Sequence, residues 1–157
     1  LLMELADILS EESVIVCSGL KTKPDVLRKL AERAAEVTSG DAGQIFEALS
    51  DREALGSTGL GNGIAIPHGK LAGLNGVTAV FVRLDTPIEF EAVDYQPVDL
   101  MMILLAPVGA GAVHLKALAR VARLLRSESA VEALRRASDA GELYAILTQP
   151  DPATKAA

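Results

Sequence analysis

The sequence is poor in cysteine and aromatic residues: it has one cysteine, no tryptophan, three phenylalanines and two tyrosines among 157 residues. A lone cysteine excludes an internal disulfide, and Cys17 lies in an apolar run where a buried strand position is the simplest interpretation. Two histidines and one cysteine without paired spacing also make a poor set of metal ligands. We therefore expect no metal and no other cofactor, and an interior filled by alanine, leucine and valine.

The chain also lacks an excess of positive charge and any long apolar run. Its formal net charge is −6, which argues against nucleic acid as a partner because basic residues supply most of that affinity. The same charge is compatible with a basic protein partner, since complementary charge speeds encounter. No run approaches the roughly 20 apolar residues of a membrane-spanning helix, and residues 1–4 lack the pattern of a signal peptide. We expect a cytoplasmic protein without membrane insertion.

Hydrophobic residues make up 50% of the chain, which is enough to bury a proper core and argues against disorder. We expect one domain over residues 1–150, followed by a frayed tail at 151–157. Apolar residues at helical spacing, together with cap signals, predict the helices. These are a short helix or turn within 2–9, a helix from Thr22 to Ser39, one from Asp41 to Gly56, one over 113–125, and two more that start at Ser129 and near Ser138.

Short apolar runs, several of them rich in β-branched residues, predict the strands. They lie at 14–17, 64–66, 77–84 and 98–106, with a loop at 57–63, a turn at 85–87 and a loop at 107–111. Strands and helices intermixed in this way are typical of an α/β protein, here a three-layer α/β/α sandwich. The central β-sheet should be mixed, because the segments between the last three strands leave no room for crossover helices.

The most informative segment is the stretch 57–70, which reads STGLGNGIAIPHGK. Its glycines allow the backbone to approach a ligand closely, and successive N–H groups in such a loop form a concavity that suits anions. A neutral imidazole is available near pH 7 as a nucleophile toward phosphorus, so we predict that His68 carries a phosphoryl group. The predicted phosphate-binding residues are Ser57, Thr58, Gly59, Gly61, Asn62 and Gly63.

Two familiar phosphate motifs do not fit this stretch. A dinucleotide fingerprint would need glycine in place of Ile64 and a strand before the glycines, and a P-loop would need Ser or Thr after Lys70. A plain connection rich in turn residues is the structural alternative for the loop, and a satisfied structural histidine is the alternative for His68. Pro67, Gly69 and the loop itself favour the reactive interpretation, because they fix the approach to the ring and leave it accessible.

His114 and Arg52 are the other candidate residues. His114 follows a glycine-containing loop and lies in the first turn of a predicted helix, where the positive end of the dipole favours an anion and disfavours a protonated histidine. A neutral His114 could donate its N–H to a phosphoryl oxygen, although a helix start without a ligand explains it as simply. Arg52 ends the helix before the loop and is suited to phosphate oxygens, and a solvated helix-end arginine is the ordinary alternative.

Residues 51–53 and 56–70 resemble the signature of enzyme IIA of the bacterial phosphotransferase system, mannitol/fructose class, and are most similar to its nitrogen-regulatory branch. Residues 96–100 and 111–120 are similar to the second signature of that family, although Val113 stands where many relatives have a more polar residue. The likeness extends from about residue 3 to about residue 147. It is therefore a resemblance of the whole domain.

This resemblance implies that His68 is phosphorylated by a histidine on a small HPr-like carrier, which a phosphoenolpyruvate-dependent enzyme I charges in turn. Arg52 matches the family's phosphate-neutralising arginine, and His114 matches its second active-site histidine. The phosphorylation state would regulate partner proteins such as kinases or transporters, and a homodimer is compatible with this role. The alternatives are a sugar-specific IIA that passes phosphate to a IIB domain, a binding module without phosphoryl turnover, and a small hydrolase that uses the same pocket.

Overall fold

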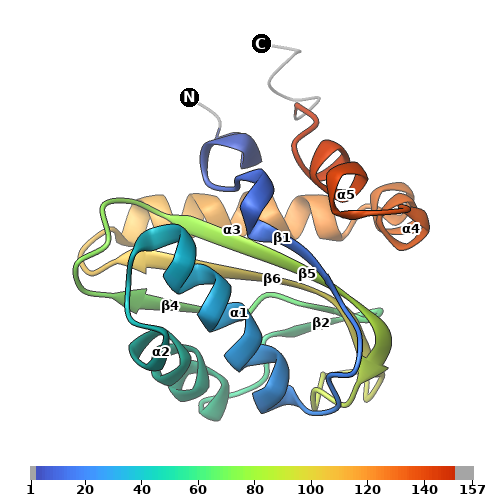
Figure 1. Cartoon of the computed structure of the whole chain (residues 1–157), viewed down its shortest axis with the longest axis horizontal. Helices are drawn as coiled ribbons and strands as arrows, with labels where there is room; N and C mark the ends of the chain where they lie inside the picture. The colour runs from blue at the N-terminus through green and yellow to red at the C-terminus, as the bar shows by residue number, and fades with distance from the viewer. Residues whose placement is uncertain (1–2, 151–157) are drawn as a thin grey trace.

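The computed structural model describes residues 3–150, so the predicted tail at 151–157 lies outside the described residues. Within them, six strands form one mixed sheet with the order β1-β5-β6-β3-β2, and β4 pairs with β6 beyond β3 (Figure 1). The strands are β1 (Val14–Cys17), β2 (Gly59–Gly61), β3 (Ile64–Ala65), β4 (His68–Leu71), β5 (Thr78–Ile88) and β6 (Val98–Pro107). β5 and β6 are antiparallel, whereas β1 is parallel to β5, and β3 and β4 are parallel to β6. The predicted mixed sheet is confirmed.

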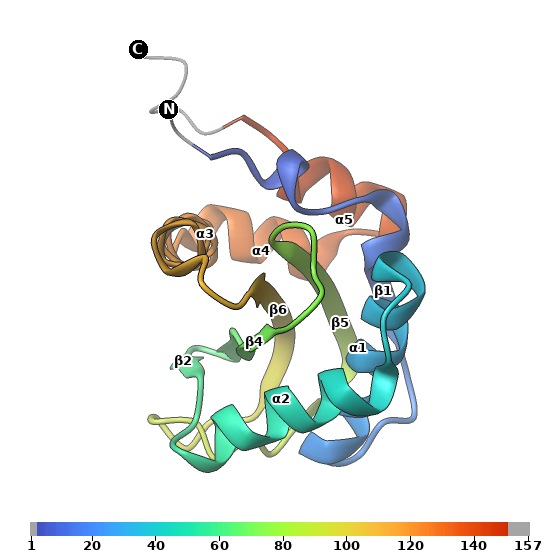
Figure 2. The same cartoon turned by 90° about the vertical axis from the view of Figure 1, so that its left-hand side faces the viewer.

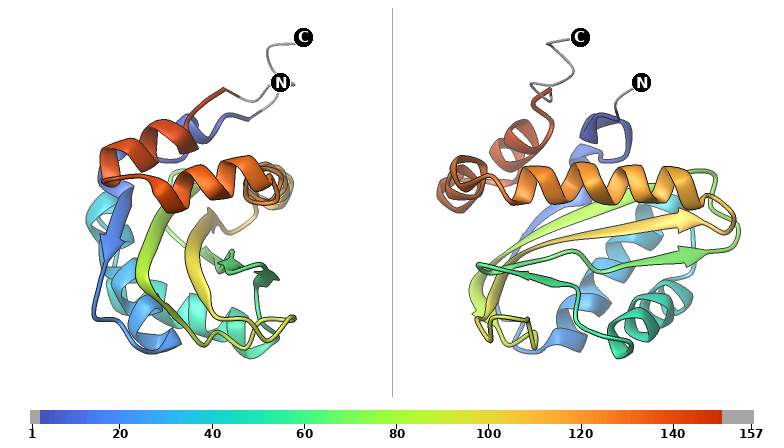
Figure 3. Two further views of the ribbon diagram at one scale, coloured as in Figure 1. Left: turned by 90° about the vertical axis from the view of Figure 1, so that its right-hand side faces the viewer. Right: turned by 180° about the vertical axis from the view of Figure 1, so that it is seen from behind.

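Helices cover both faces of this sheet, as Figure 2 and the two views of Figure 3 show. On one face lie α1 (Lys23–Thr38) and α2 (Ala42–Ala54). On the other lie α3 (Gly111–Leu125), α4 (Glu128–Arg136), α5 (Ala140–Leu147) and the 3-10 helix η1 (Leu5–Asp7), while η2 (Glu11–Ser13) leads into β1. The predicted α/β/α layering is confirmed, and the short helix or turn predicted within 2–9 is the 3-10 helix η1.

The long apolar run in β6 serves two separate cores. Successive side chains of a strand point to opposite faces, so Met102 and Leu104 pack toward α3–α5 while Met101 and Ile103 pack toward α1 and α2. All four are fully buried. This explains why a strand with no polar alternation stands at the centre of the sheet.

Side-chain caps set most helix starts. Thr22 Oγ1 accepts the Asp25 N–H at 3.2 Å, and Asp41 Oδ1 accepts the Gln44 N–H at 3.0 Å, as the sequence predicts. The prediction that the next-to-last helix begins at Ser129 is wrong. Ser127 caps α4 instead, because its hydroxyl accepts the Ala130 N–H at 3.3 Å.

Three other details differ from the prediction. The loop at 57–63 contains β2, which forms a hairpin with β3. The turn predicted at 85–87 is wrong: β5 continues to Ile88 through an irregular register with β6. Finally, β3 and β4 both pair with β6, and Pro67, which has no N–H to donate, lies between them. The chain pairs with β6 again from His68, where β4 begins. No helix within residues 3–150 is long and apolar enough to cross a membrane.

Candidate active site

His68 is the first residue of β4, directly after the proline that interrupts the edge of the sheet. Its half-buried ring places Nδ1 2.8 Å from the Ile66 carbonyl oxygen. Because a carbonyl oxygen only accepts hydrogen bonds, this contact requires the proton to be on Nδ1. The neutral ring then carries its lone pair on Nε2, which is the nitrogen available to attack an electrophile.

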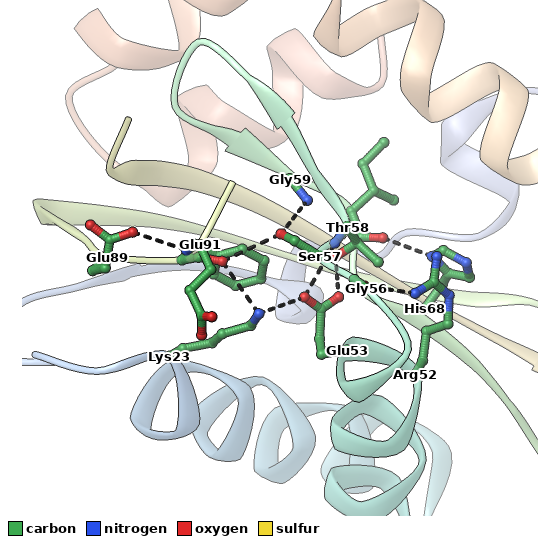
Figure 4. A network of polar contacts seen from close by, with 12 residues as sticks. Lys23, Arg52, Glu53, Gly56, Ser57, Thr58, Gly59, His68, Glu89 and Glu91 are labelled. Carbon is green, nitrogen blue, oxygen red and sulfur yellow. Dashed lines mark hydrogen bonds and ion pairs between the residues drawn. The ribbon is translucent and has the colours of Figure 1, made fainter. Parts of the chain in front are cut away.

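His68 lines a cavity of about 290 Å³ together with polar residues from the preceding loop. The C-terminal turn of α2 contributes Arg52, and the loop contributes Ser57, Thr58 and Gly59. Figure 4 shows Arg52 and the loop beside His68. The remaining wall is apolar and consists of Leu60, Ile66, Leu118 and Ala122. The structure thus brings together a nucleophilic ring and a guanidinium at one cavity, which suits a small anion. The hydroxyl protons of Ser57 and Thr58 are already donated to the Phe90 carbonyl oxygen and to Glu53.

Arg52 is held toward this cavity by its own loop. Its Nη1 donates to the Gly56 carbonyl oxygen at 2.9 Å. A guanidinium has five N–H donors, and within residues 3–150 Arg52 makes no other hydrogen bond. The other donors can therefore meet the oxygens of a phosphoryl group.

His114 lies beside His68, although the two are far apart in the sequence. It occupies the first turn of α3, only 6% of its surface is exposed, and the ring centroids are 5.6 Å apart in an edge-to-face arrangement. Burial lowers the pKa of His114 below its ordinary value, and the charges of His68 and Lys70 lower it further. Its buried Nε2 has no hydrogen-bond partner within residues 3–150. A buried neutral ring with an unmet polar atom next to the nucleophile is suited to donate to an incoming oxygen.

The lowered pKa of His114 gives a pH prediction. Below about pH 6.5 the unfolded chain takes up a proton at this position that the folded chain excludes, so the free energy of unfolding should fall as the pH drops from 7 to 5.5. His114→Gln removes this contribution, and its stability should therefore fall less over the same interval. Urea denaturation at a series of pH values measures both slopes. Equal slopes would show that His114 is not held neutral by the fold.

Several main-chain amides of the loop are already engaged inside the protein. Thr58 N–H donates to Glu53 Oε1 at 3.2 Å, Gly59 N–H to Ser57 Oγ at 3.1 Å, and Asn62 N–H to Asp94 Oδ2 at 2.9 Å. These three amides do not line up as an open anion cradle in this conformation. Binding of an anion at the cavity therefore depends more on side chains than the sequence predicts.

The predicted phosphate-binding residues separate into two groups. Ser57, Thr58 and Gly59 line the cavity with His68. Gly61 and Asn62 line a different hollow between the β2–β3 hairpin and α4. Gly63 lies against the Arg135–Asp99 ion pair, where an added Cβ would come within 2.5 Å of the Arg135 guanidinium. The glycines of the second half of the loop thus serve close packing of the hairpin and lie outside the cavity.

Two polar residues near the cavity were missed by the sequence analysis. Glu53 is buried, accepts hydrogen bonds from Thr58, and forms an ion pair with Lys23. Both residues look like ordinary solvated charges on helices when read from the sequence. The one usable signal is that Glu53 directly follows Arg52 at the end of a helix that enters the loop.

Comparison with known proteins gives consistent matches over nearly the whole chain. Residues 7–149 match the family model described as phosphoenolpyruvate-dependent sugar phosphotransferase system, EIIA 2. The chain is 48% identical to a nitrogen regulatory protein of Bradyrhizobium diazoefficiens, over 98% of this chain and 100% of that protein. It is 42% identical to the nitrogen regulatory protein of Escherichia coli, over 95% of this chain and 92% of that protein. The crystal structure of nitrogen regulatory protein IIA-Ntr from Neisseria meningitidis superposes with a TM-score of 0.84 at 39% identity, covering 92% of this chain and 99% of that one.

Proposed function

This chain belongs to the EIIA 2 family of the phosphoenolpyruvate-dependent phosphotransferase system, and from that premise we propose that it is a phosphohistidine carrier of the nitrogen-regulatory branch. His68 accepts the phosphoryl group from a histidine of an HPr-like carrier protein. The single observation that carries this proposal is the hydrogen bond from His68 Nδ1 to the Ile66 carbonyl, which leaves Nε2 as a lone-pair nucleophile at the cavity.

The transfer moves one phosphoryl group between two imidazole rings. The Nε2 lone pair of His68 forms a new N–P bond while the N–P bond of the donor breaks, and its electron pair returns to the donor nitrogen. A donor ring that is protonated on its other nitrogen leaves as neutral imidazole, and the positive charge passes to the His68 ring, which keeps its Nδ1 proton. The Ile66 carbonyl accepts that N–H throughout and stabilises the charged ring.

The other residues of the site orient the phosphoryl group and neutralise its charge during the transfer. Such a transfer passes through a loose phosphoryl species with charge on three oxygens, so stabilising those oxygens is the main task of the protein. Arg52 supplies a fixed positive charge at the cavity. His114, held neutral beside His68, supplies an N–H without the charge that would oppose positive charge on the His68 ring.

The surface around the site supports a regulatory role. Apolar side chains are exposed in the segments that carry the site residues: Leu55 is 85% exposed after α2, and Val113 and Leu115 flank His114 at 46% and 69%. Exposed apolar groups of this kind favour docking of a protein partner. A phosphoryl group on His68 adds about two negative charges beside them and so changes which partners bind. The regulated proteins would be partners such as kinases or transporters in the cytoplasm.

The proposal is tested by incubating the protein with radioactive phosphoenolpyruvate, enzyme I and an HPr-like carrier. We expect a label that is stable in base and labile in acid, approaching one phosphoryl group per chain, and no label when the carrier is omitted. A folded protein that takes up no label under these conditions would be a binding module, and the proposal would fail. Rapid onward transfer to a fructose or mannitol IIB domain would favour the sugar-specific alternative.

A further inference from the structure

The part of the cavity wall that contains Thr58 rests on a buried carboxylate. Glu53, in the last turn of α2, accepts the Thr58 N–H on Oε1 at 3.2 Å and the Thr58 hydroxyl on Oε2. Its side chain is 5% exposed. Thr58 is one of the residues that line the cavity. Both of its donors are thus engaged by Glu53 (Figure 4).

Lys23 holds this carboxylate from the other side. Its Nζ lies 2.8 Å from Glu53 Oε1 and donates to the Phe90 carbonyl oxygen at 3.3 Å, with only 16% of the side chain exposed. The same carbonyl accepts the Ser57 hydroxyl at 3.3 Å. The contacts join the start of α1, the end of α2, the loop and the segment after β5 into one network.

The loop is also fixed by a close backbone approach. A Cβ built on Gly59 would lie 2.7 Å from the Ala92 Cβ, so the loop can lie here only with glycine at this position. Ser57 Oγ accepts the Gly59 N–H while donating to Phe90, which orients the same turn. The cavity wall is therefore built against residues 90–92 and has little freedom to move.

We propose that Glu53 and Lys23 are positioning residues for phosphoryl transfer, an inference that rests on the proposed function. Glu53 fixes the backbone of Thr58 and Gly59, so that the wall facing His68 and the neighbouring Arg52 is in place before the donor arrives. Lys23 fixes Glu53 and neutralises it. Neither residue lines the cavity, so both would act through the loop.

Neutralisation by Lys23 matters because Glu53 is a buried negative charge next to the loop that must receive a dianion. Without Lys23 the carboxylate would be left uncompensated at low local dielectric and would repel the phosphoryl group. Lys23→Met should therefore be phosphorylated more slowly than the double variant Lys23→Met/Glu53→Gln. In the double variant both charges are gone, and the glutamine side chain still offers Thr58 an acceptor. This order of rates distinguishes a charge effect from the mere loss of contacts.

The experiment compares single-turnover and steady-state phosphorylation of Glu53→Ala, Lys23→Met and the double variant by the carrier protein. Loss of the charge-assisted hydrogen bonds in Glu53→Ala should lower kcat by about tenfold with KM for the carrier unchanged, because the docking surface is left intact. Leu143→Ala serves as the matched control: it weakens the buried side of α5, which contributes no residue to the cavity. Rates are compared per folded molecule.

A readout that needs no phosphoryl transfer is the Thr58 amide in two-dimensional NMR spectra. Its resonance should shift in Glu53→Ala and remain in place in Leu143→Ala. If wild type takes up no phosphoryl group while Thr58 behaves as expected, the proposed function fails and not the network. The positioning role is overturned if Glu53→Ala is phosphorylated as fast as Leu143→Ala, or if Glu53→Ala has a raised KM and an unchanged kcat. It is also overturned if the Thr58 amide resonance of Glu53→Ala has the same chemical shift as in the wild type.

Discussion

His68→Ala should take up no phosphoryl group from the carrier protein, whatever the time of incubation. The substitution removes the ring that, among residues 3–150, alone lines the cavity with its Nε2 lone pair fixed by a hydrogen bond at Nδ1. Removing a nucleophile leaves no atom to accept the group, so the loss should be complete and not a change of rate. Acid-labile label per folded chain, after incubation with the carrier, enzyme I and phosphoenolpyruvate, measures it.

His114→Ala is the natural control for this experiment. It should slow labelling and leave the acceptor in place, because in the proposed mechanism His114 stabilises the oxygens and does not receive the group. Circular dichroism and thermal unfolding establish that both variants are folded. Full labelling of His68→Ala, or complete loss of labelling in a folded His114→Ala, would mean that the acceptor has been misassigned.

Arg52→Ala should slow transfer by about 10²-fold, which is the typical cost of one preorganised donor in such a site. The guanidinium lines the cavity and donates to the Gly56 carbonyl oxygen, and in the proposed mechanism its remaining donors meet the phosphoryl oxygens. Arg52→Lys should recover only part of the rate, because an ammonium group cannot reproduce the planar fork. Rapid-quench measurement of the labelling rate at saturating carrier gives both values.

The comparison for this prediction is Arg136→Ala. Arg136 lies on the exposed surface of α4 and pairs with Glu132 four residues earlier. Surface pairs of this kind contribute little to stability, so the variant should label at the wild-type rate. If Arg52→Ala were labelled as fast as Arg136→Ala, Arg52 would be an ordinary surface charge.

Much of the fold was predictable because local signals and global packing agree. The cap residues Thr22 and Asp41 start the helices that they predict, and the apolar run in β6 forms a strand that is buried on both faces. The mixed sheet followed from the lengths of the connections alone. Each of these features depends on residues close in the sequence.

Two of the failures involve strand pairing with β6. Residues 85–87 contain a turn-like proline, yet they continue a strand because β6 offers pairing on both sides of the irregularity. β4 has no apolar alternation and exists only because β6 is available to pair with it. A third failure is local: Ser127 and Ser129 are both suitable cap residues, and α4 begins after Ser127, directly behind the end of α3.

For the site, the sequence singled out His68, His114 and Arg52, and the structure brings all three to one region. The direction of the loop amides was not predictable. Glycines predict that a backbone can approach a ligand, but they do not say whether its N–H groups are already used by Glu53 or Asp94. The tautomer of His68 likewise depends on a carbonyl whose position only the fold determines.

The most direct measurement is the identity of the phosphorylated nitrogen, from long-range proton–nitrogen and phosphorus NMR spectra of the phosphorylated protein. We expect phosphorus on Nε2 of His68, with Nδ1 still protonated and hydrogen-bonded to the Ile66 carbonyl. A phosphoryl group on Nδ1 of His68, or on either nitrogen of His114, would contradict the mechanism.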